Sequence, residues 1–147
     1  MKRVSLIDKS HNGSTNVELQ RKAESLKLRN FRGVFMIDEL IKLKPLKQEC
    51  GIVNLQTSDK NGSHWVCWFI NGNDKVYFDS FGAPPDLRVA KYLKKKNKNH
   101  ILYSTYQIQQ FNDTNCSEWS LYVLNKLNNG EDYLDIVLEI LNKYKLY

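Results

Sequence analysis

Four residues of this sequence have the types and positions that thiol catalysis requires. Such catalysis needs a thiolate, a base, a group that orients the base, and hydrogen-bond donors for an oxyanion. Cys116 stands where a polar segment becomes a predicted helix, and the free N–H groups of a helix start favour a thiolate. The predicted roles are Cys116 as nucleophile, His64 as general base, Asp79 as the group orienting His64, and Gln109, seven residues before Cys116, as oxyanion donor.

A β-hairpin is expected to bring the predicted base and its orienting group together. Asn71-Gly72-Asn73-Asp74 lies between two segments rich in strand-forming residues and is a strong hairpin signal, with the turn expected around Asn71-Gly72. His64 and Asp79 are symmetric about this turn, so their side chains can meet at the open end of the strand pair.

Each of these residues also has a purely structural interpretation. A cysteine at a helix start is usually a small core residue, a histidine beside a tryptophan usually packs, and an aspartate after a strand usually forms a turn. Catalysis is favoured because nucleophile, base, orienting group and donor all stand at ends of elements. Gln107 and Gln110 are alternatives to Gln109, whereas Cys67 is expected in the core, and His11 and His100 lie in polar segments.

The elements around these residues predict an α+β fold with a mainly antiparallel central sheet flanked by helices. Apolar periodicity predicts helices near residues 17–28, 86–93, 116–129 and 133–144. Strands are expected at residues 50–55, 64–70, 75–79 and 101–107, while residues 31–36 form a short apolar segment, extended or irregular. No repeat or linker interrupts this order, so residues 1–147 are expected to form one domain.

Composition is typical of a folded domain and excludes several other classes. Hydrophobic residues make up 41% of the 147 residues and charged residues 26%, and no stretch is long and apolar enough for a membrane span or a signal peptide. Three cysteines, an odd number, argue against a disulfide framework, and their spacing does not suit a zinc site. We therefore expect no metal and a reducing compartment.

At the level of motifs, the sequence resembles the adenain-like cysteine proteases, which comprise the adenovirus maturation protease and relatives encoded by virophages and polinton-type elements. The resemblance is collinear from about residue 31 to residue 124. Its motifs are Phe31-x-Gly33-x-Phe35, then Cys50-x-Ile52-Val53-Asn54 followed by His64-Trp65 with the spacing kept, then Phe78-Asp79-Ser80-Phe81-Gly82, and finally Ser104-Thr105 through Gln109 and Asn112 to Cys116.

This resemblance implies a papain-like, adenain-like fold and the same four catalytic roles. It also implies that Trp65 packs against the catalytic pair as a wall of the substrate cleft. The chain departs from the family in having Asp79 where adenovirus enzymes carry Glu, and Ser117 where Gly is usual. Residues 94–103 contain no cysteine to tether an activating peptide, so no disulfide-linked cofactor is expected.

The implied function is that of a viral maturation endopeptidase that cleaves capsid or scaffold precursors. Such an enzyme is expected to be a monomer that acts in the virion and in the host cytoplasm or viral factory, without contact with a membrane. No cofactor is required by the sequence, and activation by a peptide or by DNA stays open.

Two other functions remain as alternatives. One is a deSUMOylase-like isopeptidase of the same clan, which a panel of ubiquitin-like substrates would reveal. The other is a non-enzymatic, DNA-associated module, suggested by a net charge of +6. The candidate DNA contacts are Lys94, Lys95, Lys96 and Lys98, a run that is also typical of a solvated helix end.

Overall fold

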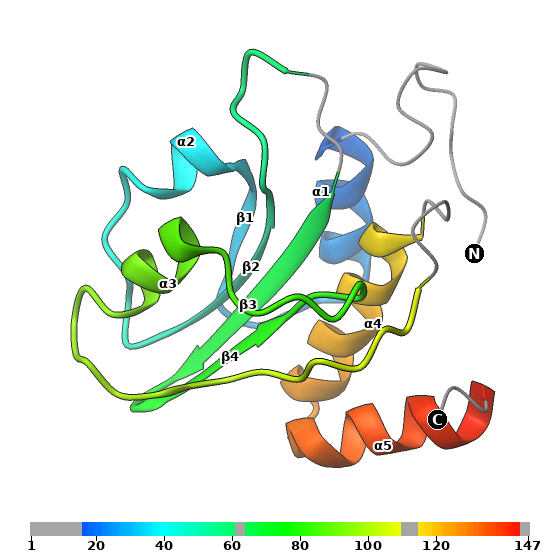
Figure 1. The fold of residues 1–147 in the computed structure, drawn as a ribbon. Coiled ribbons are helices and arrows are strands. Elements are labelled where there is room, and N and C mark those ends of the chain that lie inside the picture. Colours follow the sequence, from blue (N-terminus) through cyan, green and yellow to red (C-terminus); the bar gives the residue numbers. More distant parts are fainter. Residues whose placement is uncertain (1–15, 61–63, 110–114, 145–147) are drawn as a thin grey trace.

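The protein is described by a computed structural model that covers residues 16–60, 64–109 and 115–144 (Figure 1). None of the helices in these ranges is long and apolar enough to cross a membrane. In chain order, the elements are α1 (Asn16–Ser25), β1 (Phe31–Met36), α2 (Ile37–Leu40), β2 (Gln48–Asn54), β3 (Trp65–Asn71), β4 (Asp74–Phe78), α3 (Leu87–Leu93), β5 (Ile101–Leu102), α4 (Cys116–Asn128) and α5 (Tyr133–Tyr144).

The strands form one sheet in the order β1-β2-β3-β4-β5. The long central ladders, β2 with β3 and β3 with β4, are antiparallel, and the outer pairs are parallel. The predicted hairpin is present, but Asn71 pairs with Asp74, so its turn is Gly72-Asn73, one residue later than expected. The expected α+β class with a mainly antiparallel central sheet is confirmed.

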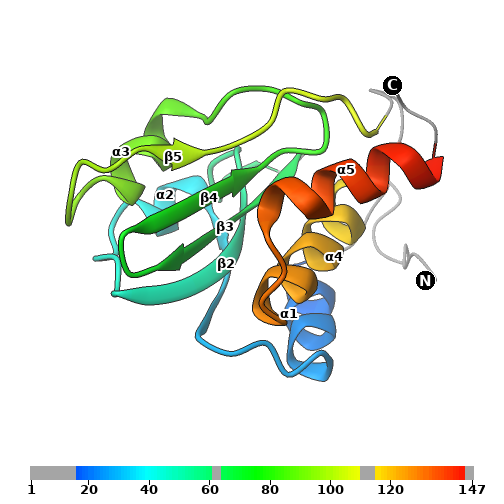
Figure 2. The same cartoon turned by 90° about the horizontal axis from the view of Figure 1, so that it is seen from below.

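Helices cover both faces of this sheet and create two hydrophobic cores. Side chains alternate along a strand, and β3 follows this rule closely. Trp65 and Cys67 lie in the core under α1, α4 and α5, whereas Val66 and Trp68 lie in the core under α2 and α3. Figures 1 and 2 show these helices on opposite faces of the sheet. The placement of Cys67 in the core confirms the sequence prediction.

Two elements differ from the sequence prediction. The strand expected at residues 101–107 pairs with β4 only through Ile101 and Leu102. Beyond them the backbone leaves the ladder, and the N–H groups of Ile108 and Gln109 donate to the carbonyl of Ser80 after β4 has ended. The short helix α2 was not expected, since its four residues are too few to show a helical period. At this edge of the sheet, the loop after β4 is therefore hydrogen-bonded to the segment that contains Gln109.

Candidate active site

The central hairpin places His64 immediately before β3 and Asp79 immediately after β4. Their side chains meet as expected: Nε2 of His64 lies 2.6 Å from Oδ1 of Asp79. Asp79 is buried, and the same Oδ1 also accepts the backbone N–H of Phe81 at 2.8 Å. A carboxylate held in this way fixes the imidazole ring and favours the tautomer with hydrogen on Nε2.

Cys116 is the first residue of α4, and only 6% of its surface is exposed. The backbone N–H of Trp65, the residue after the candidate base, donates to Cys116 Sγ at 3.4 Å. His64 therefore lies one residue from a direct contact with the thiol. Nδ1 of His64 is buried and has no hydrogen-bond partner among the residues that the structure describes. This ring nitrogen is the one left to exchange a proton with Cys116.

Charge at the site favours the protonated imidazole. Burial alone would lower the pKa of His64, but hydrogen bonding to Asp79 and the interaction with Cys116 raise the pKa to about 9. A positive charge beside a cysteine is a general means of activating it as a nucleophile. The arrangement can therefore supply a nucleophile and a proton donor at the same time.

Gln109 is buried close to the end of β4, held there by Ser80. Its Oε1 accepts a hydrogen bond from the Ser80 hydroxyl, and its backbone N–H donates to the Ser80 carbonyl at 3.0 Å. Gln107 is used differently, because its Nε2 donates to the Gln109 carbonyl at 3.0 Å. Gln110, the other alternative donor, lies outside the described residues. Among the described glutamines of this segment, Gln109 is the one tied to the loop that carries Asp79.

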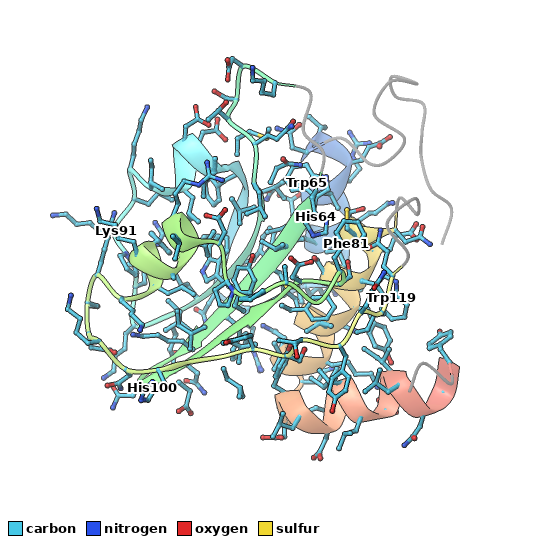
Figure 3. All side chains as sticks on the ribbon, viewed as in Figure 1. His64, Trp65, Phe81, Lys91, His100 and Trp119 are labelled. Carbon is cyan, nitrogen blue, oxygen red and sulfur yellow. The ribbon has the colours of Figure 1, made fainter. Side chains whose placement is uncertain are left out.

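Sequence reasoning assigned no role to Phe81 and Ser80, although both lie in the quoted motif. The ring of Phe81 stacks on the imidazole of His64, with centroids 4.2 Å apart and planes 9° from parallel. Figure 3 shows these two side chains beside each other at the start of β3. The only sign of these contacts in the sequence was that both residues follow Asp79 directly. Their contacts could be inferred only once the pairing register of β3 and β4 was known.

The remaining predicted residues lie as follows. Trp65 is 9% exposed and contributes to the core beneath α4, and its role as a cleft wall stays a prediction. His100 is exposed at the far end of the sheet from His64 (Figure 3), and His11 lies outside the described residues. Among the described residues, no three His, Cys, Asp or Glu side chains gather as metal ligands would.

The lysine run follows α3, as its composition predicted. Lys94 caps the helix, and Lys96 and Lys98 are exposed. Lys95 is engaged within the fold, since its Nζ donates at 2.8 Å to the carbonyls of Ile41 and of Leu43, just after α2. The four lysines are therefore not equivalent as candidate DNA contacts.

By sequence the chain matches no family model and no curated protein. By structure it is similar to the ASFV pS273R protease, with a TM-score of 0.55 and 19% identity over 82% of this chain and 59% of that one. It is also similar to HopZ1a, in a complex with IP6 and CoA, with a TM-score of 0.52 and 13% identity over 78% of this chain and 42% of that one. The SUMO protease Ulp1 follows with a TM-score of 0.48 and 16% identity, over 86% of this chain and 73% of that one.

The first two likenesses concern the fold. The chain has an α+β fold with a central sheet flanked by helices, and this fold is similar to that of the ASFV pS273R protease. It spans 59% of the length of the ASFV pS273R protease and 42% of that of HopZ1a. At such low identity, a function has to be argued from the side chains of the site itself.

Proposed function

We propose that this chain is a cysteine endopeptidase whose triad is Cys116, His64 and Asp79, with Gln109 as oxyanion donor. One observation carries the proposal: His64 is held by Asp79 through Nε2, while its buried Nδ1 is left for the thiol of Cys116. A histidine that served only for packing would not need a buried carboxylate on one side and a helix-start cysteine on the other.

The proposed reaction is acyl transfer through a thioester. The Cys116 thiolate attacks the carbonyl carbon of the scissile peptide bond, and the electron pair of the C=O bond moves onto oxygen. Two groups stabilise this oxyanion: Nε2 of Gln109, and the backbone N–H of Cys116 in the first turn of α4, where N–H groups have no partner within the helix. The imidazolium of His64 gives its proton to the leaving amine as the C–N bond breaks. His64 then removes a proton from water, which hydrolyses the thioester and releases a carboxylic acid and Cys116.

We further propose that the substrates are capsid or scaffold precursors of a virus, and that the chain is an adenain-like maturation protease. The collinear motifs from residue 31 to residue 124 support this proposal, together with the fold that the chain has in common with the ASFV pS273R protease. Family resemblance suggests small residues, often Gly, near the cleaved bond, and action in the virion or viral factory. The substrate would lie extended across the cleft.

The proposal is tested by incubating the purified chain with a peptide library and with the capsid protein of its own genome. Mass spectrometry should find new termini with the wild type and none with Cys116→Ala, because the substitution removes the nucleophile and changes little else. Cleavage of ubiquitin-like conjugates at their isopeptide bond, with no cleavage of any peptide, would identify the chain as an isopeptidase instead of an endopeptidase. A wild type that cleaves nothing, while Cys116 still reacts with iodoacetamide, would overturn the proposal.

A further inference from the structure

Three consecutive residues after β4, Asp79, Ser80 and Phe81, contact both the proposed general base and the proposed oxyanion donor. Asp79 orients the imidazole of His64, and the Phe81 ring stacks on that imidazole. Between them, Ser80 faces the segment that leads to α4 and contacts Gln109. The general base and the oxyanion donor therefore depend on one short piece of chain, although they lie 45 residues apart in the sequence.

Ser80 binds Gln109 through both its backbone and its side chain. The Ser80 carbonyl accepts the N–H groups of Ile108 at 2.9 Å and of Gln109 at 3.0 Å, which fixes where the backbone of Gln109 lies. The Ser80 hydroxyl donates to Oε1 of Gln109, which fixes how the carboxamide is turned. Both side chains are 1% exposed, so water does not compete strongly for this hydrogen bond.

The orientation of the carboxamide decides whether Gln109 can act. A carboxamide has an acceptor oxygen and a donor nitrogen at opposite ends, and an oxyanion is stabilised only by the nitrogen. A hydroxyl that donates to Oε1 holds the oxygen on the Ser80 side and leaves Nε2 turned the other way. Preorganised donors stabilise a transition state most because they need not reorient during the reaction.

We propose that Ser80 is the positioning residue of the oxyanion donor: its hydroxyl fixes the carboxamide of Gln109 so that Nε2 points to the developing oxyanion. This inference rests on the proposed endopeptidase function. Ser80 does not touch the substrate and acts only through Gln109, so its effect must vanish when Gln109 is absent.

The test compares Ser80→Ala, Ser80→Thr, Gln109→Ala and the double variant Ser80→Ala/Gln109→Ala in the full chain, on one peptide that the wild type cleaves. Misplacing a catalytic group typically costs about 10- to 100-fold, so we expect Ser80→Ala to lower kcat by about that factor with little change in KM. The double variant should be no slower than Gln109→Ala, because the two residues act as a unit.

Ser80→Thr separates positioning from stability. It keeps the donating hydroxyl but adds a methyl group in a buried place, so it should lower Tm and retain kcat within a few-fold of the wild type. Ser80→Ala leaves the buried Oε1 of Gln109 without this donor, so it should also lower Tm, but it should lower kcat far more than Ser80→Thr does. The matched control is Ser104→Ala, which removes a hydroxyl from the segment that leads to Gln109, one that lies 2.8 Å from the Tyr133 hydroxyl. It should leave kcat unchanged.

Alkylation of Cys116 by iodoacetamide supplies an independent readout, because this reaction forms no oxyanion. Its rate should be the same in the wild type and in Ser80→Ala. A slower alkylation in Ser80→Ala would show that Ser80 acts through Asp79 and His64, and an unchanged kcat would show that it does not act at all. Either result overturns the inference while the wild type remains active, whereas a wild type without turnover overturns the proposed function itself.

Discussion

At the scale of single residues, the central feature of the site is that burial and the neighbouring groups shift the pKa of His64 in opposite directions. Burial disfavours a charged imidazole, yet the buried Asp79 carboxylate and the neighbouring Cys116 outweigh burial and bring the pKa to about 9. The usual pKa of histidine is near 6.5, so the folded state binds this proton more tightly than the unfolded chain does. The same interactions that prepare the site for catalysis therefore also contribute to stability in a limited range of pH.

The first prediction concerns this pH range. A raised pKa means that the stabilisation is fully present below about pH 6.5 and is lost as pH rises through about 9, and the shift corresponds to about 3 kcal/mol at most. Urea unfolding at pH 6 and pH 9.5 should show this loss for the wild type and a much smaller one for Asp79→Asn. Equal losses in both proteins would mean that the pair does not set the proton affinity of His64.

The second prediction concerns the three thiols. Burial raises the pKa of both Cys50 and Cys67, which lie in the core, so neither should react at neutral pH. Cys116 lies at a helix start beside the imidazolium and should be the fast-labelling thiol. Peptide mapping after brief treatment with iodoacetamide should find one modified site in the wild type and none in Cys116→Ala. Fast labelling of Cys50 or Cys67 would contradict the assignment of the nucleophile.

At the scale of elements, the site depends on how closely the loop after β4 approaches the segment before α4. Gly82 lies at this approach with φ of +81°, and its N–H donates to the Asp79 carbonyl at 2.9 Å. A Cβ on Gly82 would lie 2.9 Å from the backbone of Thr105 and Tyr106, too close to be accommodated without movement. The segment that would have to move continues directly to Gln109.

The third prediction uses a matched pair of glycines. Gly72 also has positive φ, +65°, but an added Cβ there would meet nothing within 4 Å. Gly72→Ala should therefore cost about 1–2 kcal/mol of stability through backbone strain alone and leave kcat unchanged. Gly82→Ala should cost more and should also lower kcat. Urea unfolding measures the stability of both variants, and peptide hydrolysis measures their kcat. Equal kcat in the two variants would mean that the close approach at Gly82 does not affect catalysis.

At the scale of the whole molecule, the net charge of +6 is the reason to propose a contact with DNA. The fold narrows the lysines that could make this contact. Because Lys95 is bound to carbonyl groups after α2, any phosphate contact from the run should come from Lys94, Lys96 and Lys98. Lys95 then serves as an internal comparison, since its replacement should affect stability.

The fourth prediction follows from this difference. If the run binds DNA, replacing Lys94, Lys96 and Lys98 by Gln should weaken binding and flatten the slope of log affinity against log salt by about 0.9 per lost phosphate contact. Lys95→Gln should lower Tm and leave that slope nearly unchanged. Fluorescence anisotropy with duplex DNA at several salt concentrations measures both, and an unchanged slope in the triple variant would leave the run as a solvated helix end.

The elements whose signals are local could be predicted from the order of the amino acids. The hairpin was predictable because Asn and Gly accept the backbone angles of a tight turn, and α4 and α5 were predictable because apolar residues recur with a helical period. The types and order of Cys116, His64, Asp79 and Gln109 also pointed to thiol chemistry before any distance was known. The turn lies one residue later than expected, but this difference still places both His64 and Asp79 at the open end of the strand pair.

Features that depend on contacts between distant segments could not be predicted without the folded structure. Whether Phe31–Met36 forms a strand, and how soon the chain leaves the sheet after Ile101, depend on which neighbouring edge is available, and no local pattern encodes that. Similarly, the hydrogen bond from Ser80 to Gln109 and the engagement of Lys95 arise between residues far apart in the chain. The side-chain types were fixed by the sequence, but their hydrogen-bond partners were set by packing, because burial forces each polar group to find a partner wherever the fold brings one within reach.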